Sequence, residues 1–212
     1  MSGEVEYFYT LVSPWTYLGH ERLTAICAAA GVAIVHKPVD LGAVFQVSGG
    51  LPLNKRAVQR QNYRWYELQR WRAYRERPLN LRPKFFPADA NTANRMVIAA
   101  QAAGGDASRL AGAFLRAVWA EDRNIADRAT MKAVADENRL DGDALLEAAT
   151  GNPVVVADYE RLTEEAKTRE VFGAPTYIYR GEPFWGQDRL EFLERALTGA
   201  APTLSLPAEA RT

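Results

Sequence analysis

The first candidate for chemistry is a serine at a predicted helix start. Ser13 opens the tetrapeptide Ser13-Pro14-Trp15-Thr16, shortly after an apolar segment. At a helix start, free N–H groups and the positive end of the helix dipole favour an anion, so a thiolate placed there has a lowered pKa and a hydroxyl adds one more donor. Ser-Pro is also a common helix cap, and the tetrapeptide alone favours that structural role.

Two further motifs lie near the other end of the chain. Gly173-Ala174-Pro175-Thr176 places a proline just before an apolar segment, and Gln187-Asp188 precedes the last predicted helix. The N–H groups at that helix start could bind a carboxylate, while Asp188 is equally suited to cap the helix. Pro175 is also compatible with an ordinary turn and a trans peptide bond.

The elements that position these motifs are strands at the two ends of the chain and helices between them. Alternating β-branched and aromatic residues predict strands at residues 4–10, 33–39, 176–179 and 183–185. Ser13-Pro14 begins and Gly31 ends a helix between the first two strands, which implies a right-handed parallel crossover. Helical spacing predicts further helices at residues 56–75, 91–103, 108–120, 129–138, 141–150, 152–171 and 188–197.

This order of elements resembles a thioredoxin fold interrupted by a helical block. Ser13 and Thr16 stand where a thioredoxin-like oxidase carries its two cysteines, and Gly173-Ala174-Pro175-Thr176 matches the loop whose proline, usually cis, precedes the third strand. With the run Phe184-Trp185-Gly186-Gln187-Asp188-Arg189-Leu190 and the segment from Phe86 to Arg95, these motifs resemble the DsbA-like family that contains kappa-class glutathione transferases and 2-hydroxychromene-2-carboxylate isomerases.

The resemblance implies an α/β fold of DsbA-like type. Residues 1–43 and 172–200 would form a thioredoxin-like domain, and residues 44–171 would form a large inserted all-helical domain. Residues 201–212 have no periodic pattern and are expected to be a C-terminal tail.

The resemblance also implies a glutathione site. Because Ser13 replaces the attacking cysteine, bound glutathione would bring the sulfur and Ser13 would be the catalytic residue. A cis bond before Pro175 would turn the backbone of Ala174 toward the cysteinyl part of glutathione, and Gln187 with Asp188 would hold its γ-glutamyl end. The implied glutathione-binding set is Ser13, Trp15, Asn54, Ala174, Pro175, Gln187 and Asp188.

The implied activity is isomerisation of 2-hydroxychromene-2-carboxylate to trans-o-hydroxybenzylidenepyruvate, a step in the breakdown of naphthalene-like aromatic hydrocarbons. Two alternatives stay open: a kappa-like glutathione transferase that releases the adduct, and a non-catalytic binding protein or chaperone on the same scaffold. A small aromatic carboxylate is the expected substrate, and the family resemblance implies a homodimer.

Arginines and aromatic residues gather between residues 60 and 75 as a source of a second substrate site. One or two of the arginines could hold a planar aromatic carboxylate by stacking and by a bidentate contact. Most such side chains simply pack or face solvent, and the sequence does not choose among them. The arginines are Arg60, Arg64, Arg70, Arg72 and Arg75.

Composition limits the other functions. The formal net charge is zero, which argues against a nucleic-acid partner. His20 and His36 are isolated in the sequence, which argues against a metal site, and the single cysteine, Cys27, is expected to be a buried small hydrophobe in a reducing compartment. Residues 1–25 show neither a secretory signal nor a bilayer-spanning stretch, so we expect a cytoplasmic protein without a membrane partner.

Overall fold

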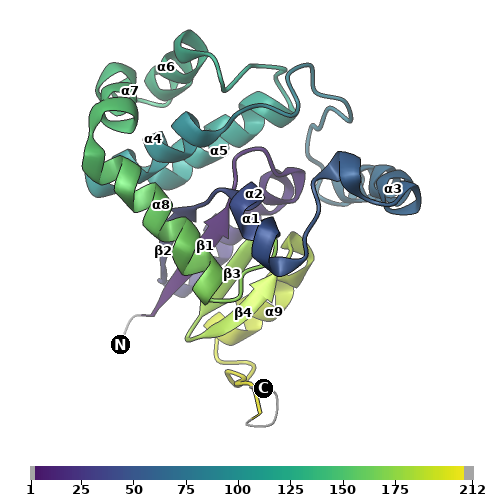
Figure 1. Ribbon diagram of the computed structural model, residues 1–212. Helices are drawn as coiled ribbons and strands as arrows, with labels where there is room; N and C mark the ends of the chain where they lie inside the picture. Colours follow the sequence, from purple (N-terminus) through teal and green to yellow (C-terminus); the bar gives the residue numbers. More distant parts are fainter. Residues whose placement is uncertain (1–2, 208–212) are drawn as a thin grey trace.

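A four-stranded mixed sheet joins the two ends of the chain in the computed structural model, which describes residues 3–207 (Figure 1). The strand order is β2-β1-β3-β4. β1 (Glu4–Tyr9) pairs in parallel with β2 (Ala33–Pro38) and antiparallel with β3 (Thr176–Tyr179), and β3 pairs antiparallel with β4 (Glu182–Trp185). The predicted strands and the parallel crossover between the first two are confirmed.

The helix α1 (Pro14–Ala30) has the ends that its sequence predicts. Ser13 is the N-cap, Pro14 occupies the first helical position, and Gly31 ends the helix at φ 64°, a left-handed conformation that glycine adopts without strain. Val32 then donates to the carbonyl of Cys27, which satisfies one of the free carbonyl groups of the last turn. Local capping therefore fixes where the chain leaves β1 and where it returns to β2.

The helices between β2 and β3 match the predicted ranges to within three residues, with one exception. They are α3 (Val58–Tyr74), α4 (Asn91–Ala102), α5 (Ala107–Trp119), α6 (Arg128–Glu137), α7 (Gly142–Gly151) and α8 (Pro153–Thr168), while α9 (Leu190–Leu197) follows β4. The helix α2 (Leu41–Ser48) was not predicted. It has only eight residues and ends at Gly49, so the apolar residues Leu41, Val44 and Phe45 span a single turn, and Asp40 begins it by accepting hydrogen bonds from Gly42 and Ala43.

The helix α2 also bears on the division of the chain into domains. The expected boundary between residues 43 and 44 falls inside α2. The division into a sheet unit and a helical insert stays a proposal, with its first boundary better placed before Asp40. Of the expected tail, residues 201–207 form no helix or strand, and residues 208–212 lie outside the described part of the chain, as do residues 1–2.

Helices cover both faces of the sheet, and the two faces differ in chemistry. On one face, the rings of Tyr7 and Tyr9 stack at 4.2 Å, and Tyr9 contacts His36 through a 3.0 Å hydrogen bond. The helices α1 and α5 lie against this face, since His20 of α1 stacks on Tyr7 and the Ser108 hydroxyl of α5 contacts His36 at 2.7 Å.

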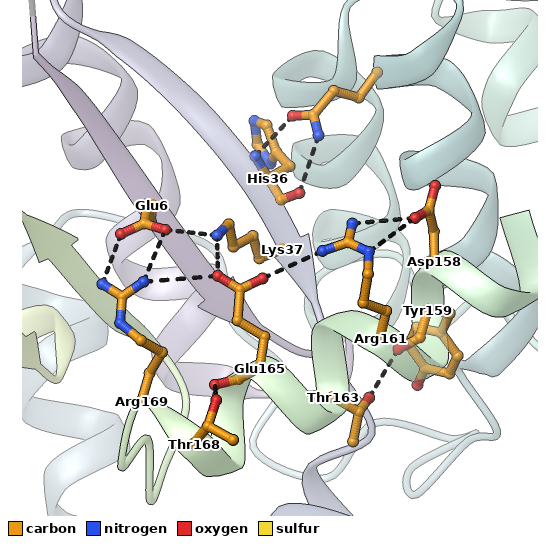
Figure 2. Close-up of polar contacts among 11 residues, drawn as sticks. Glu6, His36, Lys37, Asp158, Tyr159, Arg161, Thr163, Glu165, Thr168 and Arg169 are labelled. Carbon is orange, nitrogen blue, oxygen red and sulfur yellow. Dashed lines mark hydrogen bonds and ion pairs between the residues drawn. The ribbon is translucent and has the colours of Figure 1, made fainter.

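On the opposite face, an ion-pair network attaches α8 to the sheet. Figure 2 shows the ammonium of Lys37 between the carboxylates of Glu6 and Glu165, each at 2.5 Å, with Arg169 pairing with Glu6 at 2.8 Å. Burial alone would raise the pKa of Glu6, but hydrogen bonds from Arg169 and Lys37 outweigh it and lower that pKa. The network holds α8 across β1 and β2.

The outer edge of β2 is closed by a side chain rather than by another strand. The amide N–H of His36 donates to Oε1 of Gln101 at 2.7 Å, and Nε2 of Gln101 donates to the carbonyl of His36 at 3.1 Å. Gln101 lies on α4, so this pair of hydrogen bonds also fixes α4 beside the sheet.

Candidate active site

Ser13 lies at the point where the chain turns from β1 into α1. Its side chain is nearly buried and makes two hydrogen bonds. The oxygen Oγ accepts from the N–H of Thr16 at 3.2 Å, and the hydroxyl donates to the carbonyl of Ala174 at 3.1 Å. Ser13 is therefore the cap of α1 and at the same time the contact between α1 and the proline-containing loop.

The loop before β3 has the conformation that the sequence resemblance implies. The Ala174–Pro175 peptide bond is cis, and a second cis bond at Phe86–Pro87 was not predicted. The N–H of Gly186 donates to the carbonyl of Pro175 at 2.9 Å, which joins this loop to the turn after β4. Within residues 3–207 the N–H of Ala174 has no hydrogen-bond partner, so a donor is available beside Ser13.

Gln187 and Asp188 follow that turn in the short 3-10 helix η2 (Gln187–Arg189). Gln187 is buried against α1 at Gly19, where an added Cβ would lie 2.7 Å from the Cβ of Gln187. Asp188 is exposed, and its Oδ2 lies 3.2 Å from the guanidinium of Arg189. Neither η2 nor α9 has a side-chain cap, so the capping role considered for Asp188 is wrong.

Arg75 connects α3 to this end of the site and was not singled out from the sequence. Its Nε lies 3.3 Å from Oε1 of Gln187, and its Nη2 lies 3.3 Å from that oxygen and 3.4 Å from the Gln187 carbonyl. The guanidinium also lies over the rings of Trp71 and Tyr74, at 5.3 and 5.4 Å from their centroids. Arg75 is thus the arginine of the segment 60–75 that reaches the predicted glutathione site.

The remaining two predicted residues differ in their placement. Trp15 is half-buried, packs against the core and lies in the first turn of α1. Asn54 is exposed in the short 3-10 helix η1 (Leu53–Lys55) and, within the described residues, forms no hydrogen bond to any of the other predicted site residues. The structure therefore brings together Ser13, Ala174, Pro175, Gln187 and Asp188, with Trp15 beside them, and leaves Asn54 apart.

A buried polar chain supports the loop that carries Ser13. The N–H of Leu11 donates to Oδ1 of Asn94 at 3.3 Å, and Nδ2 of Asn94 donates to the Tyr159 hydroxyl at 3.2 Å. Tyr159 in turn donates to Asn91 at 2.9 Å, and burial raises its pKa to about 12, which keeps the hydroxyl protonated. Asn94 belongs to a motif quoted from the sequence, but nothing in the sequence indicates that it holds Leu11.

A cavity of about 210 Å³ opens beside this loop, between the N-terminal ends of α2 and α4. Val12, the residue before Ser13, lines it together with Asn94 and Tyr159, and the acidic residues Asp40 and Asp89 also belong to the lining. A second cavity, of about 250 Å³, lies between β2, α4 and α8 and does not include the predicted site residues.

An exposed aromatic pair borders the proline-containing loop and was also not predicted. The rings of Phe172 and Trp185 meet edge to face at 4.7 Å, and both side chains are about half exposed. A Cβ added to Gly173 would lie 2.4 Å from Nε1 of Trp185, so the indole ring packs directly on the loop backbone. The sequence signal was the Phe184-Trp185-Gly186 run, whose tryptophan faces solvent.

Other candidate chemistries find no support in the described part of the chain. Cys27 is buried, and burial raises the pKa of its thiol to about 12. Residues 3–207 contain no group of three or more His, Cys, Asp or Glu side chains that could hold a metal ion. No helix in that range has the length and apolar character needed to cross a membrane.

Comparison with known proteins gives a consistent result. Residues 4–198 match the family described as the DSBA-like thioredoxin domain. A 2-hydroxychromene-2-carboxylate isomerase of Sphingobium xenophagum is 30% identical over 199 residues, which cover 93% of this chain and 99% of that protein. The solved structure of a 2-hydroxychromene-2-carboxylate isomerase has a TM-score of 0.78 at 25% identity, covering 92% of this chain and 95% of that one.

A more distant neighbour shares the fold alone. The cytosolic disulfide reductase DsbM of Pseudomonas aeruginosa, solved with GSH, has a TM-score of 0.66 at 19% identity, covering 92% of this chain and 99% of that one. The sheet, the serine at the start of α1 and these matches agree, and the chain belongs to the DSBA-like thioredoxin family and, within it, to the family of the 2-hydroxychromene-2-carboxylate isomerases.

Proposed function

We propose that this chain is a glutathione-dependent isomerase that converts 2-hydroxychromene-2-carboxylate to trans-o-hydroxybenzylidenepyruvate. The observation that carries the proposal is the contact between the Ser13 hydroxyl and the Ala174 carbonyl at 3.1 Å, at the N-terminal end of α1. It joins a hydroxyl, a helix start and a loop backbone at one point, in a chain whose relatives bear this isomerase name.

The residues present suit the charge pattern of glutathione. A γ-glutamyl group carries an ammonium and a carboxylate on one carbon. Asp188 offers a carboxylate for the ammonium, and the guanidinium groups of Arg75 and Arg189 offer partners for the carboxylate. The N–H of Ala174, without a partner in the described structure, suits a backbone contact with the cysteinyl unit.

When bound, glutathione supplies a nucleophilic sulfur for reversible addition to the conjugated system of the substrate, rotation about the former double bond and elimination, so that no net conjugate forms. The chain supplies the electrostatics. The Ser13 hydroxyl can turn from the Ala174 carbonyl toward an anion, and the free N–H groups and dipole of α1 favour negative charge at the same place. The protein itself needs no sulfur at this position.

A coupled assay tests the function. The protein is incubated with 2-hydroxychromene-2-carboxylate with and without glutathione, and the absorbance of the product and the glutathione concentration are followed together. Isomerisation without glutathione consumption supports the proposal. Stoichiometric loss of glutathione with a standard electrophile would favour a transferase, and absence of glutathione binding by calorimetry would exclude both enzymes and favour a binding protein.

The biological setting is also proposed. A place in the breakdown of naphthalene-like aromatic hydrocarbons is consistent with the substrate named for the relatives. A single buried cysteine and the expected use of reduced glutathione support a cytoplasmic location. A homodimer is supported by the aromatic side chains of Tyr63, Tyr66 and Tyr74, which remain exposed on α3, and light scattering at two concentrations tests it.

A further inference from the structure

Arg64 is a buried arginine in an aromatic setting. It lies on the inner side of α3, where it and Leu68 are the buried residues of the helix, and its exposed fraction is only 9%. Its guanidinium carbon lies 5.6 Å from the ring centroid of Trp65, 5.7 Å from that of Phe86 and 5.8 Å from that of Trp119. Three flat side chains, from α3, from the loop before α4 and from α5, therefore surround one cation.

Within residues 3–207 no acidic side chain pairs with Arg64, and its guanidinium forms no hydrogen bond. Its charged neighbours are cations: burial first, and then the proximity of Arg56, lower the pKa of Arg64 to about 10. The guanidinium of Arg82 also lies over Trp65, at 5.4 Å from the ring centroid. A buried, unpaired charge is costly for folding, so the arrangement needs a reason other than stability.

A second unpartnered donor lies in the same cluster. Nε1 of Trp119 is fully buried and has no hydrogen-bond partner within residues 3–207. The side-chain nitrogens of Arg64 also lack a partner in that range, but they are not fully buried. The guanidinium therefore keeps an opening to solvent. The cluster thus offers a guanidinium donor with its positive charge and the partly exposed rings of Trp65 and Phe86, and it lacks an anion.

The position of Arg64 along α3 separates its role from that of Arg75. Arg75 contacts Gln187 at the predicted γ-glutamyl end of the glutathione site. Arg64 lies on the same side of the helix about three turns away, which corresponds to about 16 Å. The cavity beside Val12 is lined by the acidic residues Asp40 and Asp89, whose negative charges disfavour an anionic group there.

We propose that Arg64, framed by Trp65, Phe86 and Trp119, is the binding site for the carboxylate of a planar aromatic second substrate. The identity of that substrate rests on the proposed function. The guanidinium would form a bidentate pair with the carboxylate, and the partly exposed rings of Trp65 and Phe86 would contact the planar ring system, with the buried Trp119 behind them. Arg64 thereby becomes the specificity residue for an acidic substrate, distinct from the residues that hold glutathione.

Direct binding of a stable probe tests this site without turnover. Coumarin-3-carboxylate is planar, aromatic and acidic, and coumarin is the same ring system without the charge. Their dissociation constants are measured by calorimetry for the wild type, Arg64→Gln, Arg64→Lys and Arg70→Gln. Arg70 is the matched control, since it lies on the exposed side of the same helix and its substitution removes the same charge.

Arg64→Gln should raise the dissociation constant of coumarin-3-carboxylate about 10- to 100-fold, as the loss of a charge-assisted contact predicts. The dissociation constants of coumarin and of glutathione should stay unchanged. Arg64→Lys should lose part of the affinity because it keeps the charge and loses the planar fork. Arg70→Gln should behave as wild type. Equal affinity of the wild type for the two probes, or unchanged affinity in folded Arg64→Gln, would overturn the proposal.

The folding of the variants is checked by thermal unfolding. Because Arg64 lacks an acidic partner, Arg64→Met is expected to unfold no lower than the wild type, and a large fall in its unfolding temperature would show a structural role instead. The two proposals fail separately. Carboxylate binding through Arg64 without isomerisation would refute the isomerase function alone, and isomerisation that does not depend on Arg64 would refute this site alone.

Discussion

Replacing Ser13 by alanine removes two hydrogen bonds with one substitution. The N–H of Thr16 loses its cap at 3.2 Å, and the Ala174 carbonyl loses a donor at 3.1 Å. Loss of a serine cap costs about 1 kcal/mol, and loss of a second, partly buried hydrogen bond costs about another 1 kcal/mol. We therefore expect the free energy of unfolding to fall by about 1–2 kcal/mol, whether or not Ser13 is catalytic.

The thiol of bound glutathione reports the catalytic role separately. A hydroxyl that donates to a thiolate forms a charge-assisted bond of about 1.5–3 kcal/mol, equivalent to about one to two pKa units. In Ser13→Ala the pKa of the bound thiol should rise by that amount, and turnover near neutral pH should fall with it. Overall glutathione affinity should change little, because the γ-glutamyl contacts remain.

The assay combines three measurements on each variant: urea unfolding, an ultraviolet titration of thiolate absorbance with bound glutathione, and turnover. Ser13→Thr keeps a hydroxyl and a cap and should restore most of both effects. Asp141→Ala removes the N-cap of α7, far along the chain, and should lower stability by about 1 kcal/mol without changing the thiol pKa. If Ser13→Ala loses stability while thiol pKa and turnover stay at wild-type values, Ser13 is only a cap.

Four further outcomes are expected. Asp188→Ala should weaken the binding of glutathione by about 1–3 kcal/mol in calorimetry and leave the fold intact, since Asp188 caps no helix. An unchanged dissociation constant would show that Asp188 does not belong to the site. Cys27→Ser should keep most turnover, and neither the variant nor the wild type should reduce insulin. Loss of turnover in the folded variant would mean that Cys27, and not bound glutathione, supplies the attacking sulfur. Asn94→Ala should lower kcat more than it raises the KM for glutathione, because Leu11 loses its support. If the variant is only less stable to heat and keeps its kcat, the role of Asn94 is merely structural. Burial lowers the pKa of His20 to about 4, against the opposing effect of its hydrogen bond with the Ser108 carbonyl, and lowers the pKa of His36 to about 3. Both side chains are therefore neutral in the folded protein, and the unfolded chain binds more protons below pH ~6.5. Stability should then be constant above about pH 7 and fall by on the order of 2 kcal/mol per histidine at about pH 5 in urea unfolding, and a flat profile from pH 7 to 5 would contradict this.

The parts of the fold that depend on local signals could be predicted from the sequence. α1 has the predicted ends because Ser13 and Gly31 determine them within the segment itself. β3 matches its predicted range because apolar alternation and the preceding proline both mark it. α2 is not predicted because its eight residues are too short for the apolar pattern to repeat.

The parts of the site that depend on contacts between distant residues could not be predicted. Arg75 and Gln187 are separated by 112 residues, and no pattern in either segment indicates that one reaches the other. The five arginines of residues 60–75 have the same side chain, and only their burial and neighbours distinguish Arg64 and Arg75 from the solvated ones. Family resemblance located Ser13, Ala174, Pro175, Gln187 and Asp188, whose neighbourhood the structure then describes.

The hydrogen bonds between Gln101 and His36 limit how this protein can assemble. A single carboxamide takes the place of a neighbouring strand at β2, so another chain could extend the sheet there only by displacing Gln101. The other outer strand, β4, contains Pro183, which has no N–H to offer a partner. Both borders of the sheet thus carry a feature that disfavours strand exchange, which favours association of two copies through helix surfaces and a sheet that keeps its four strands.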